Sequence, residues 1–230
     1  MKKIAIIPAR GGSKRIPRKN IKDFLGKPII AYSIEAAISS GLFDEVMVST
    51  DDSEIAEIAK SLGAHVPFLR SKKNSDDFAS TADVIIEVIT EYEKKGKYFD
   101  TACCLYSTAP FVTKERLIEG FNLFEEKKYS AVLPLLKFSF PIQRAVSLDK
   151  NRSVSFIQPE HQLTRSQDLT PAFHDSGQFY WLNVPAFQKA KTVWTDNTGA
   201  IILTEMEVQD IDTLEDWEIA ELKFKIVNGK

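Results

Sequence analysis

An apolar run that breaks into a basic, glycine-containing loop lies near the start of the chain and strongly constrains its fold. Residues 4–20 read Ile-Ala-Ile-Ile-Pro-Ala-Arg-Gly-Gly-Ser-Lys-Arg-Ile-Pro-Arg-Lys-Asn. Four consecutive apolar residues leave no polar face for solvent, as in a buried parallel strand. Glycine lets the loop turn sharply and approach a ligand closely. Strands that feed such loops present N–H groups and cations to phosphate in α/β proteins. The stretch therefore predicts a parallel sheet that holds a polyphosphate.

The loop differs from two common nucleotide-binding motifs. A Walker A motif needs Gly-x-x-x-x-Gly-Lys-Ser/Thr, and Gly11-Gly12 does not complete Gly-x-Gly-x-x-Gly. A Gly-x-Ser-x-Gly nucleophile motif does not occur either, so hydrolase chemistry has little support. The alternative interpretation is that the cations only solvate a surface loop. Because they directly follow a buried strand, we favour phosphate contacts from Arg10, Ser13, Lys14 and Lys19.

Strand and helix patterns alternate along most of the chain, which predicts an α/β fold with a doubly wound, mostly parallel sheet. After the first strand, further strands are expected over residues 46–50, 64–69, 101–106, 129–136, 178–182 and 199–203. Helical periods are expected over residues 28–41, 53–62, 81–95, 114–127 and 212–224.

The alternation lapses over residues 137–175. Short β-like pieces at residues 145–148 and 154–157 flank Asp149-Lys150-Asn151, a turn composition, so we expect a β-hairpin insertion. The core would then comprise residues 1–136 and 176–230. Such a hairpin cannot easily bury both faces against the parent sheet, which predicts a homodimer in which the partner subunit covers it.

Composition and charge distribution narrow the class of protein. No apolar run approaches the ~20 residues of a membrane span, and no signal-peptide pattern precedes the first strand, so we expect a cytoplasmic protein without a membrane partner. Residues 1–27 carry nine Lys or Arg and one acid, whereas residues 205–221 carry eight acids and no base. This asymmetry suggests that the basic and the acidic segment meet around phosphates and a metal ion. We do not expect a nucleic acid as a partner. The adjacent Cys103 and Cys104 read as small buried hydrophobes.

Two acids near the end of the chain are candidate metal ligands. In an extended backbone Asp210 and Asp212 point to the same face, which suits one hard cation between them. Such a pair within a basic site would complement Mg²⁺ on a triphosphate. The alternative for Asp212 is helix capping next to Thr213.

Polar and aromatic residues further along the chain are candidate sugar contacts. Arg165 and the run Asp175-Ser-Gly-Gln-Phe-Tyr-Trp181 combine glycine with polar and aromatic side chains, which line sugar-like ligands well. A buried edge strand with a bulge at Gly177 is an equally good interpretation of the run.

Four motifs together resemble the CMP-sugar synthetases that activate nonulosonic acids, and the resemblance extends nearly end to end. They are Ala9-Arg-Gly-Gly-Ser-Lys-x-x-Pro-x-Lys-Asn20, Val48-Ser-Thr-Asp-Asp52, Pro67-Phe-Leu-Arg70 and Asp210-Ile-Asp212. The resemblance implies a Rossmann-like nucleotidyltransferase fold, CTP and a nine-carbon sugar acid as substrates, and Mg²⁺ or Mn²⁺ as the cofactor. The anomeric hydroxyl would attack the α-phosphorus of CTP, so catalysis would consist mainly of positioning and electrostatic stabilisation.

Two departures from the sialic acid pattern look like the pseudaminic acid branch of that family. The turn Leu105-Tyr-Ser-Thr-Ala-Pro-Phe111 replaces a Leu-Gln-Pro-Thr-Ser-Pro type, and Ser176-Gly-Gln-Phe-Tyr-Trp181 replaces an Asn-Gly before the aromatic strand. Both lie where the resemblance places the sugar, so the nucleotide should be unchanged and the sugar different.

The resemblance also implies roles for individual residues. Lys19, Arg10 and Asp212 would be catalytic, and Asp210 and Asp212 would hold the metal. The nucleotide would contact Ala9, Arg10, Gly11, Ser13, Lys14, Asn20, Arg70 and Ser80. The sugar would contact Tyr106, Ser107, Thr108, Gln178, Tyr180 and Arg165.

Several alternatives stay open. Within the class, the sugar could be sialic, legionaminic or 3-deoxy-octulosonic acid, the last disfavoured because that branch generally lacks the Gly-Gly-Ser-Lys loop. A non-catalytic CTP sensor would keep Arg10 and Arg70 and release no pyrophosphate. A nicotinamide-dependent dehydrogenase is disfavoured by the missing glycine fingerprint.

Overall fold

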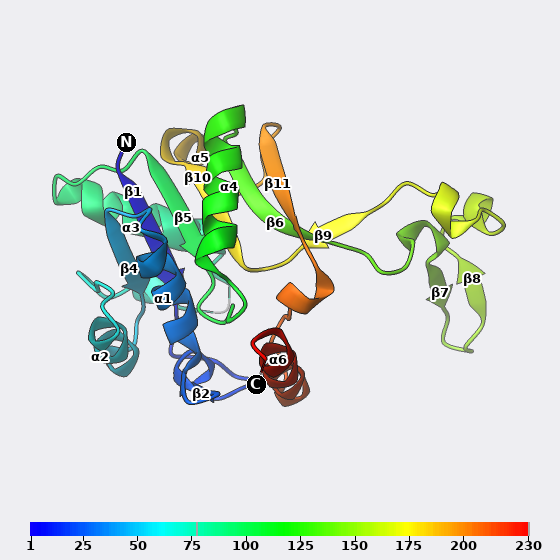
Figure 1. Cartoon of the computed structure of the whole chain (residues 1–230), viewed down its shortest axis with the longest axis horizontal. Helices are drawn as coiled ribbons and strands as arrows, with labels where there is room; N and C mark the ends of the chain where they lie inside the picture. The colour runs from blue at the N-terminus through cyan, green and yellow to red at the C-terminus, as the bar shows by residue number, and fades with distance from the viewer. Residues whose placement is uncertain (77, 230) are drawn as a thin grey trace.

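A single mixed sheet with helices on both faces forms the body of the molecule in the computed structural model, which describes residues 1–76 and 78–229 (Figure 1). The strands are Lys3–Pro8 (β1), Asp23–Phe24 (β2), Lys27–Pro28 (β3), Glu45–Ser49 (β4), Thr101–Leu105 (β5), Ala131–Lys137 (β6), Val146–Leu148 (β7), Val154–Phe156 (β8), Phe173–Asp175 (β9), Phe179–Asn183 (β10) and Thr198–Leu203 (β11). The α-helices are Ile29–Ser40 (α1), Ser53–Ser61 (α2), Thr81–Lys94 (α3), Lys114–Lys127 (α4), Val184–Ala190 (α5) and Leu214–Val227 (α6).

The central sheet has the order β11-β6-β10-β5-β1-β4, and β9 also pairs with β6. β1 is parallel to both β4 and β5, and β11 is parallel to β6. β10 runs antiparallel between β5 and β6. The expected doubly wound, mostly parallel sheet is therefore confirmed, with two reversed strands, β10 at its centre and β9 beside β6.

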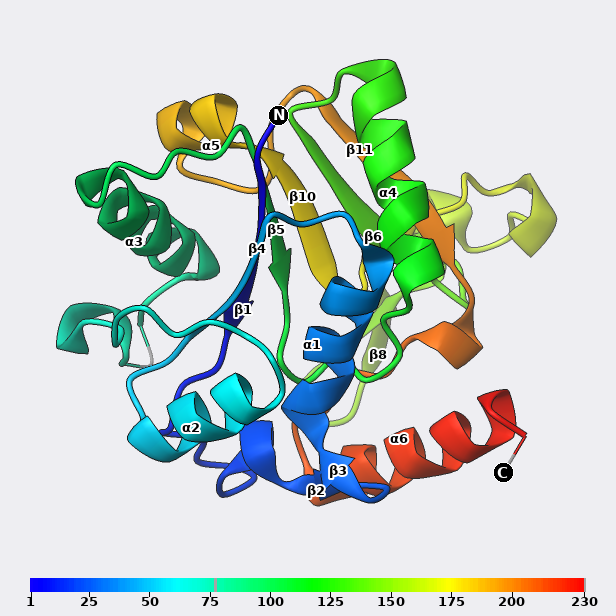
Figure 2. The ribbon, with the colours of Figure 1, turned by 60° about the vertical axis from the view of Figure 1, so that its left-hand side comes forward.

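Helices cover the two faces of the sheet separately. α1, α2 and α4 pack on one face, and α3 and α5 on the other (Figure 2). The neighbouring Cys103 and Cys104 point to opposite faces, each fully buried with a free thiol. Their burial confirms the prediction of two small buried hydrophobes. A third apolar cluster joins α6 to the β2–β3 hairpin through Trp217 and Phe24.

Three short elements were not expected, and one expected strand does not form. The β2–β3 hairpin, β9 and α5 have too few residues to show a clear apolar period. Residues 64–69 make only a bridge between His65 and Met47, so the strand prediction was wrong. Pro67 lacks the N–H that would continue the ladder.

The segment after β6 leaves the body of the molecule and forms the expected hairpin from β7 and β8 (Figure 1). Several apolar side chains of this segment face outward, including Phe140, which is 83% exposed, and Leu163, which is 92% exposed. The chain rejoins the sheet at β9, so residues 173–175 pair with β6. Among the described residues, no helix has the length and apolar character that a bilayer crossing requires.

Candidate active site

The carboxyl ends of β1 and β5 form the point at which the sheet reverses its winding. From β1 the chain moves to β4 on one side, and it later returns to β5 on the other. Open α/β sheets bind ligands at such a switch point. A cavity of about 460 Å³ lies here, lined by Pro8, Arg10, Ser13, Lys14, Arg15, Lys19, Asn20, Arg70, Ala79, Thr81, Val84, Tyr106, Ser107 and Thr108.

Hydrogen bonds fix the basic loop against the ends of three strands. The Ala9 N–H donates to the Ser49 carbonyl beside it at 2.9 Å. Asn20 is buried, and its Nδ2 donates to the Arg10 carbonyl at 2.8 Å. The Ser107 hydroxyl lies 2.9 Å from Asn20 Oδ1 and 2.8 Å from the Pro8 carbonyl. Asn20 and Ser107 thus shape the cavity by holding the backbone around it.

Arg70 supplies a buried cation at the cavity wall. Its Nε donates to Ser49 Oγ at 3.0 Å, and its guanidinium also binds the Ser49 carbonyl. Burial lowers the pKa of Arg70, which nevertheless remains protonated at neutral pH. A partly desolvated cation attracts phosphate more strongly than a hydrated one because the local dielectric screens it less.

The acidic C-terminal segment meets the basic loop at this cavity. Arg15 Nη1 lies 2.8 Å from Asp212 Oδ2, and Lys19 Nζ lies 3.6 Å from Asp212 Oδ1. Lys19 also donates to the Ile211 carbonyl at 2.6 Å. Asp212 does not cap α6, because Thr213 takes that position and forms a capping box with Asp216.

The candidate metal ligands differ in their surroundings. Asp210 is exposed, whereas Asp212 is half-buried and held by the cations described above. Across residues 1–76 and 78–229, no three His, Cys, Asp or Glu side chains gather closely enough to hold a metal by themselves. Mg²⁺ commonly takes one or two carboxylates together with substrate phosphates, so this donor set fits a metal that arrives with a nucleotide.

A second cavity of about 340 Å³ adjoins the first, and Tyr106 and Thr81 line both. The Tyr106 hydroxyl lies 3.0 Å from Thr81 Oγ1. Across this cavity, the Tyr180 hydroxyl donates to Asp175 Oδ2 at 2.6 Å. Burial raises the pKa of both tyrosines, so both hydroxyls stay protonated at neutral pH.

Three residues predicted to contact the sugar or the nucleotide do not line the cavity at the switch point. Gln178 is buried and lines neither cavity, because its Nε2 donates to the Glu207 carbonyl at 2.5 Å. Arg165 belongs to the insertion, lines neither cavity, and pairs with Asp168 at 2.7 Å. Ser80 lines the second cavity and also caps α3.

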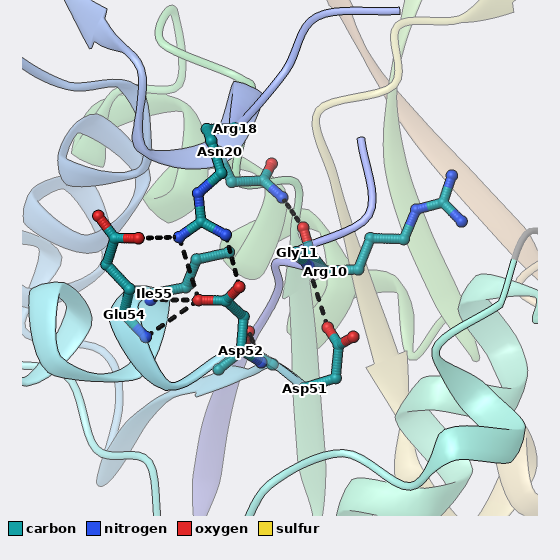
Figure 3. Close-up of polar contacts among 9 residues, drawn as sticks. Arg10, Gly11, Arg18, Asn20, Asp51, Asp52, Glu54 and Ile55 are labelled. Atoms are coloured by element: carbon teal, nitrogen blue, oxygen red, sulfur yellow. Dashed lines mark hydrogen bonds and ion pairs between the residues drawn. The ribbon is translucent and has the colours of Figure 1, made fainter. Parts of the chain in front are cut away.

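The sequence reading did not identify the acids that hold the loop, which Figure 3 shows. The Gly11 N–H donates to Asp51 Oδ1 at 3.0 Å. Arg18 makes two bonds to Asp52, with Nη1 at 2.5 Å and Nη2 at 3.1 Å from its carboxylate oxygens. The guanidinium lowers the pKa of Asp52 to about 2. In the sequence, both acids appeared only as part of the motif Val48-Ser-Thr-Asp-Asp52.

Comparisons with known proteins show which family the sequence matches. A family model described as Cytidylyltransferase matches residues 4–218. A pseudaminic acid cytidylyltransferase of Campylobacter jejuni subsp. jejuni serotype O:2 is 44% identical over 226 residues, which cover 98% of this chain and 97% of that protein. A CMP-N,N'-diacetyllegionaminic acid synthase of Legionella pneumophila subsp. pneumophila is 30% identical, with 96% and 95% of the two chains covered.

Solved structures share the fold at low sequence identity. A CMP:2-keto-3-deoxy-manno-octonic acid synthetase complexed with CTP superposes with a TM-score of 0.72 at 17% identity, and the match covers 100% of both chains. A 4-diphosphocytidyl-2C-methyl-D-erythritol synthase from Anaerococcus prevotii superposes with a TM-score of 0.66 at 14% identity, covering 97% of this chain and 98% of that one.

Proposed function

The chain belongs to the cytidylyltransferase family, and we propose that it transfers CMP from CTP to the anomeric hydroxyl of pseudaminic acid. In this reaction the anomeric oxygen forms a bond to the α-phosphorus, and the bond from that phosphorus to pyrophosphate breaks. The similarity to the Campylobacter enzyme over nearly the whole chain carries the proposal. The two adjoining cavities at the switch point support it, because the reaction needs room for a nucleotide and a sugar.

The basic loop would bind the triphosphate. Arg10, Lys14, Arg15 and Lys19 all line the larger cavity, together with Ser13 and the buried Arg70. Cations fixed in a partly desolvated site stabilise the negative charge that develops on departing pyrophosphate. The protein therefore accelerates the reaction chiefly by holding the reactants in line and neutralising charge.

Asp212 and Asp210 would hold Mg²⁺ or Mn²⁺, which when bound supplies a Lewis acid for the phosphate oxygens. Asp212 pairs with Arg15 and Lys19, two cations of the loop that line the larger cavity. In a metal–triphosphate complex, the acids there can bind the metal ion while the basic residues neutralise the phosphates.

The second cavity would receive the sugar acid, and Tyr106 would divide it from the nucleotide. Its hydroxyl and that of Thr81 offer hydrogen-bonding groups to acylamino and hydroxyl groups of a sugar, and the Tyr180 hydroxyl, whose proton is donated to Asp175, offers an acceptor. Substitution of Tyr106 by Gln should raise KM for the sugar acid at least tenfold and leave CTP affinity unchanged, as expected for loss of a specific hydrogen-bonding wall. Calorimetry with CTP and steady-state kinetics with the sugar measure the two effects, and equal losses of both would make the residue structural.

The insertion would bind a second copy of the chain. Its outward-facing apolar side chains form a surface of the kind that marks subunit interfaces, and they lie on an arm away from the sheet. Light scattering at micromolar concentration should give twice the monomer mass. A monomer mass, or an unchanged dimer after replacement of residues 145–157 by a short linker, would exclude this mode of assembly.

One experiment tests the activity directly. The protein is incubated with CTP, Mg²⁺ and pseudaminic, legionaminic, sialic or 3-deoxy-octulosonic acid in turn, and pyrophosphate release is measured. We expect the highest kcat/KM with pseudaminic acid. A higher kcat/KM with another acid would make that acid the preferred substrate. If CTP bound but no acid led to pyrophosphate release, the protein would be better explained as a CTP sensor.

A further inference from the structure

Two consecutive acids at the end of β4 hold the two ends of the basic loop. Asp51 Oδ1 accepts from the Gly11 N–H at the start of the loop, at 3.0 Å. Asp52 binds the Arg18 guanidinium near the end of the loop with both carboxylate oxygens. Figure 3 shows both attachments. The loop cations that line the cavity lie between the two attached residues in the sequence or next to them: Arg10, Lys14, Arg15 and Lys19.

Asp52 is held rigidly, so it can serve as a fixed point. Besides the two bonds from Arg18, its carboxylate accepts from the N–H groups of Glu54 and Ile55, both at 3.0 Å. These bonds cap the first turn of α2. Through Asp52, the loop is therefore attached to α2 and to the end of β4, which are both packed in the body of the molecule.

Arg18 is engaged by acids and is not one of the residues that line the cavity. Its second contact is Glu54, at 2.5 Å from Nη2. The backbone of Arg18 is left-handed, with φ at 56°, a conformation that costs free energy for a residue with a side chain. The next residue, Lys19, does line the cavity. The ion pair thus stabilises the turn that aims Lys19.

We propose that Arg18, Asp51 and Asp52 are positioning residues that hold the phosphate-binding loop in its productive shape, and that Arg18 itself does not bind the nucleotide. This inference rests on the proposed function for its substrate. Its structural part rests only on the hydrogen bonds from Gly11 and Arg18 to the two acids. The loop cations would act on CTP only while both ends of the loop are held.

Substitutions at the Arg18–Asp52 pair test the proposal. Arg18→Gln removes the ion pair, and Asp52→Asn removes the charge but keeps a capping oxygen for α2. Each should lower kcat for pyrophosphate release about 10²-fold, as for a misplacement of about 1 Å, with a smaller change in KM. The double variant should lose no more than either single variant, because both remove the same contact. Arg18→Lys should recover part of the loss, since it restores charge without the two-pronged geometry.

Binding of CTP, measured by calorimetry, distinguishes positioning from direct contact. If Arg18 bound phosphate, Asp52→Asn would release it and tighten CTP binding, which would overturn the proposal. Additive losses in the double variant, or full kcat in Arg18→Gln, would overturn it as well.

Arg152→Gln is the matched control, because Arg152 is also left-handed, with φ at 64°, but lies in the turn of the β7–β8 hairpin. It should retain kcat. If no sugar acid supports release, CTP affinity and protection of the loop from proteolysis still report its position.

Discussion

Gly11 lies so close to Asp52 that a single methyl group should disturb the loop. A Cβ at this position would lie 2.7 Å from Asp52 Oδ2 and 3.0 Å from Asp52 Cβ. It would have to recede by about 0.7 Å to reach an ordinary contact. Asp52 cannot easily yield, because Arg18 and the first turn of α2 hold its carboxylate. The displacement should therefore fall on the loop.

Gly11→Ala should consequently reduce both stability and turnover. Overpacking of this kind costs about 1–3 kcal/mol, and each kcal/mol lowers Tm by roughly 2–4 °C in a chain of this size. Movement of the loop by a large fraction of an ångström should lower kcat by at least about tenfold. Urea or thermal unfolding measures the first effect, and pyrophosphate release with saturating CTP measures the second.

The neighbouring glycine provides a matched comparison for stability. A Cβ at Gly12 would have no atom within 4 Å. Gly12→Ala should therefore change the free energy of unfolding by no more than about 0.5 kcal/mol. If Gly11→Ala and Gly12→Ala unfolded at the same denaturant concentration, Gly11 would not be packed tightly against Asp52.

Three further perturbations test other parts of the site. Lys19→Ala should lower turnover about 10²-fold, because it removes one preorganised charge at a developing anion; an unchanged rate of pyrophosphate release would contradict this role. Asp212→Ala should raise the Mg²⁺ concentration needed for half-maximal rate, and an identical metal titration would leave Asp212 with only its ion pairs to Arg15 and Lys19. The lowered pKa of Asp52 stabilises the fold above its ordinary pKa of 3.8, and this contribution should disappear as pH falls towards about 2. The difference in Tm between wild type and Asp52→Asn should therefore shrink between pH 4 and 2, and a constant difference would argue against a charged pair.

The parts of the fold that the sequence predicts are those with local signals. β1, β4 and β5 appear as continuous apolar runs because both of their faces are buried. The antiparallel place of β10 between β5 and β6 depends on contacts between distant residues, which periodicity does not report. The failed strand over residues 64–69 shows that one proline can outweigh an apolar pattern.

The candidate site likewise contains residues that the sequence identifies and residues that only the structure reveals. The loop cations could be identified because glycine and charge cluster within a few residues after a strand. The function of Asp51 and Asp52 in holding the loop could not, because their partners Gly11 and Arg18 lie far from them in the sequence. Gln178 illustrates the opposite case. Its polar side chain suggested a ligand, yet the Glu207 carbonyl satisfies it inside the protein.

The place of β10 in the sheet determines when this protein can complete its fold. β5 and β6 do not pair with each other, since β10 lies between them and joins the two halves of the sheet. During synthesis, a nascent chain that ends before residue 179 therefore has two apolar strands with unpaired inner edges. Such edges pair readily with other chains, and long-range strand pairing is slow. Partial chains should aggregate. The whole projecting segment must emerge from the ribosome before β10 can join strands β4, β1 and β5 to strands β6 and β11 in one sheet.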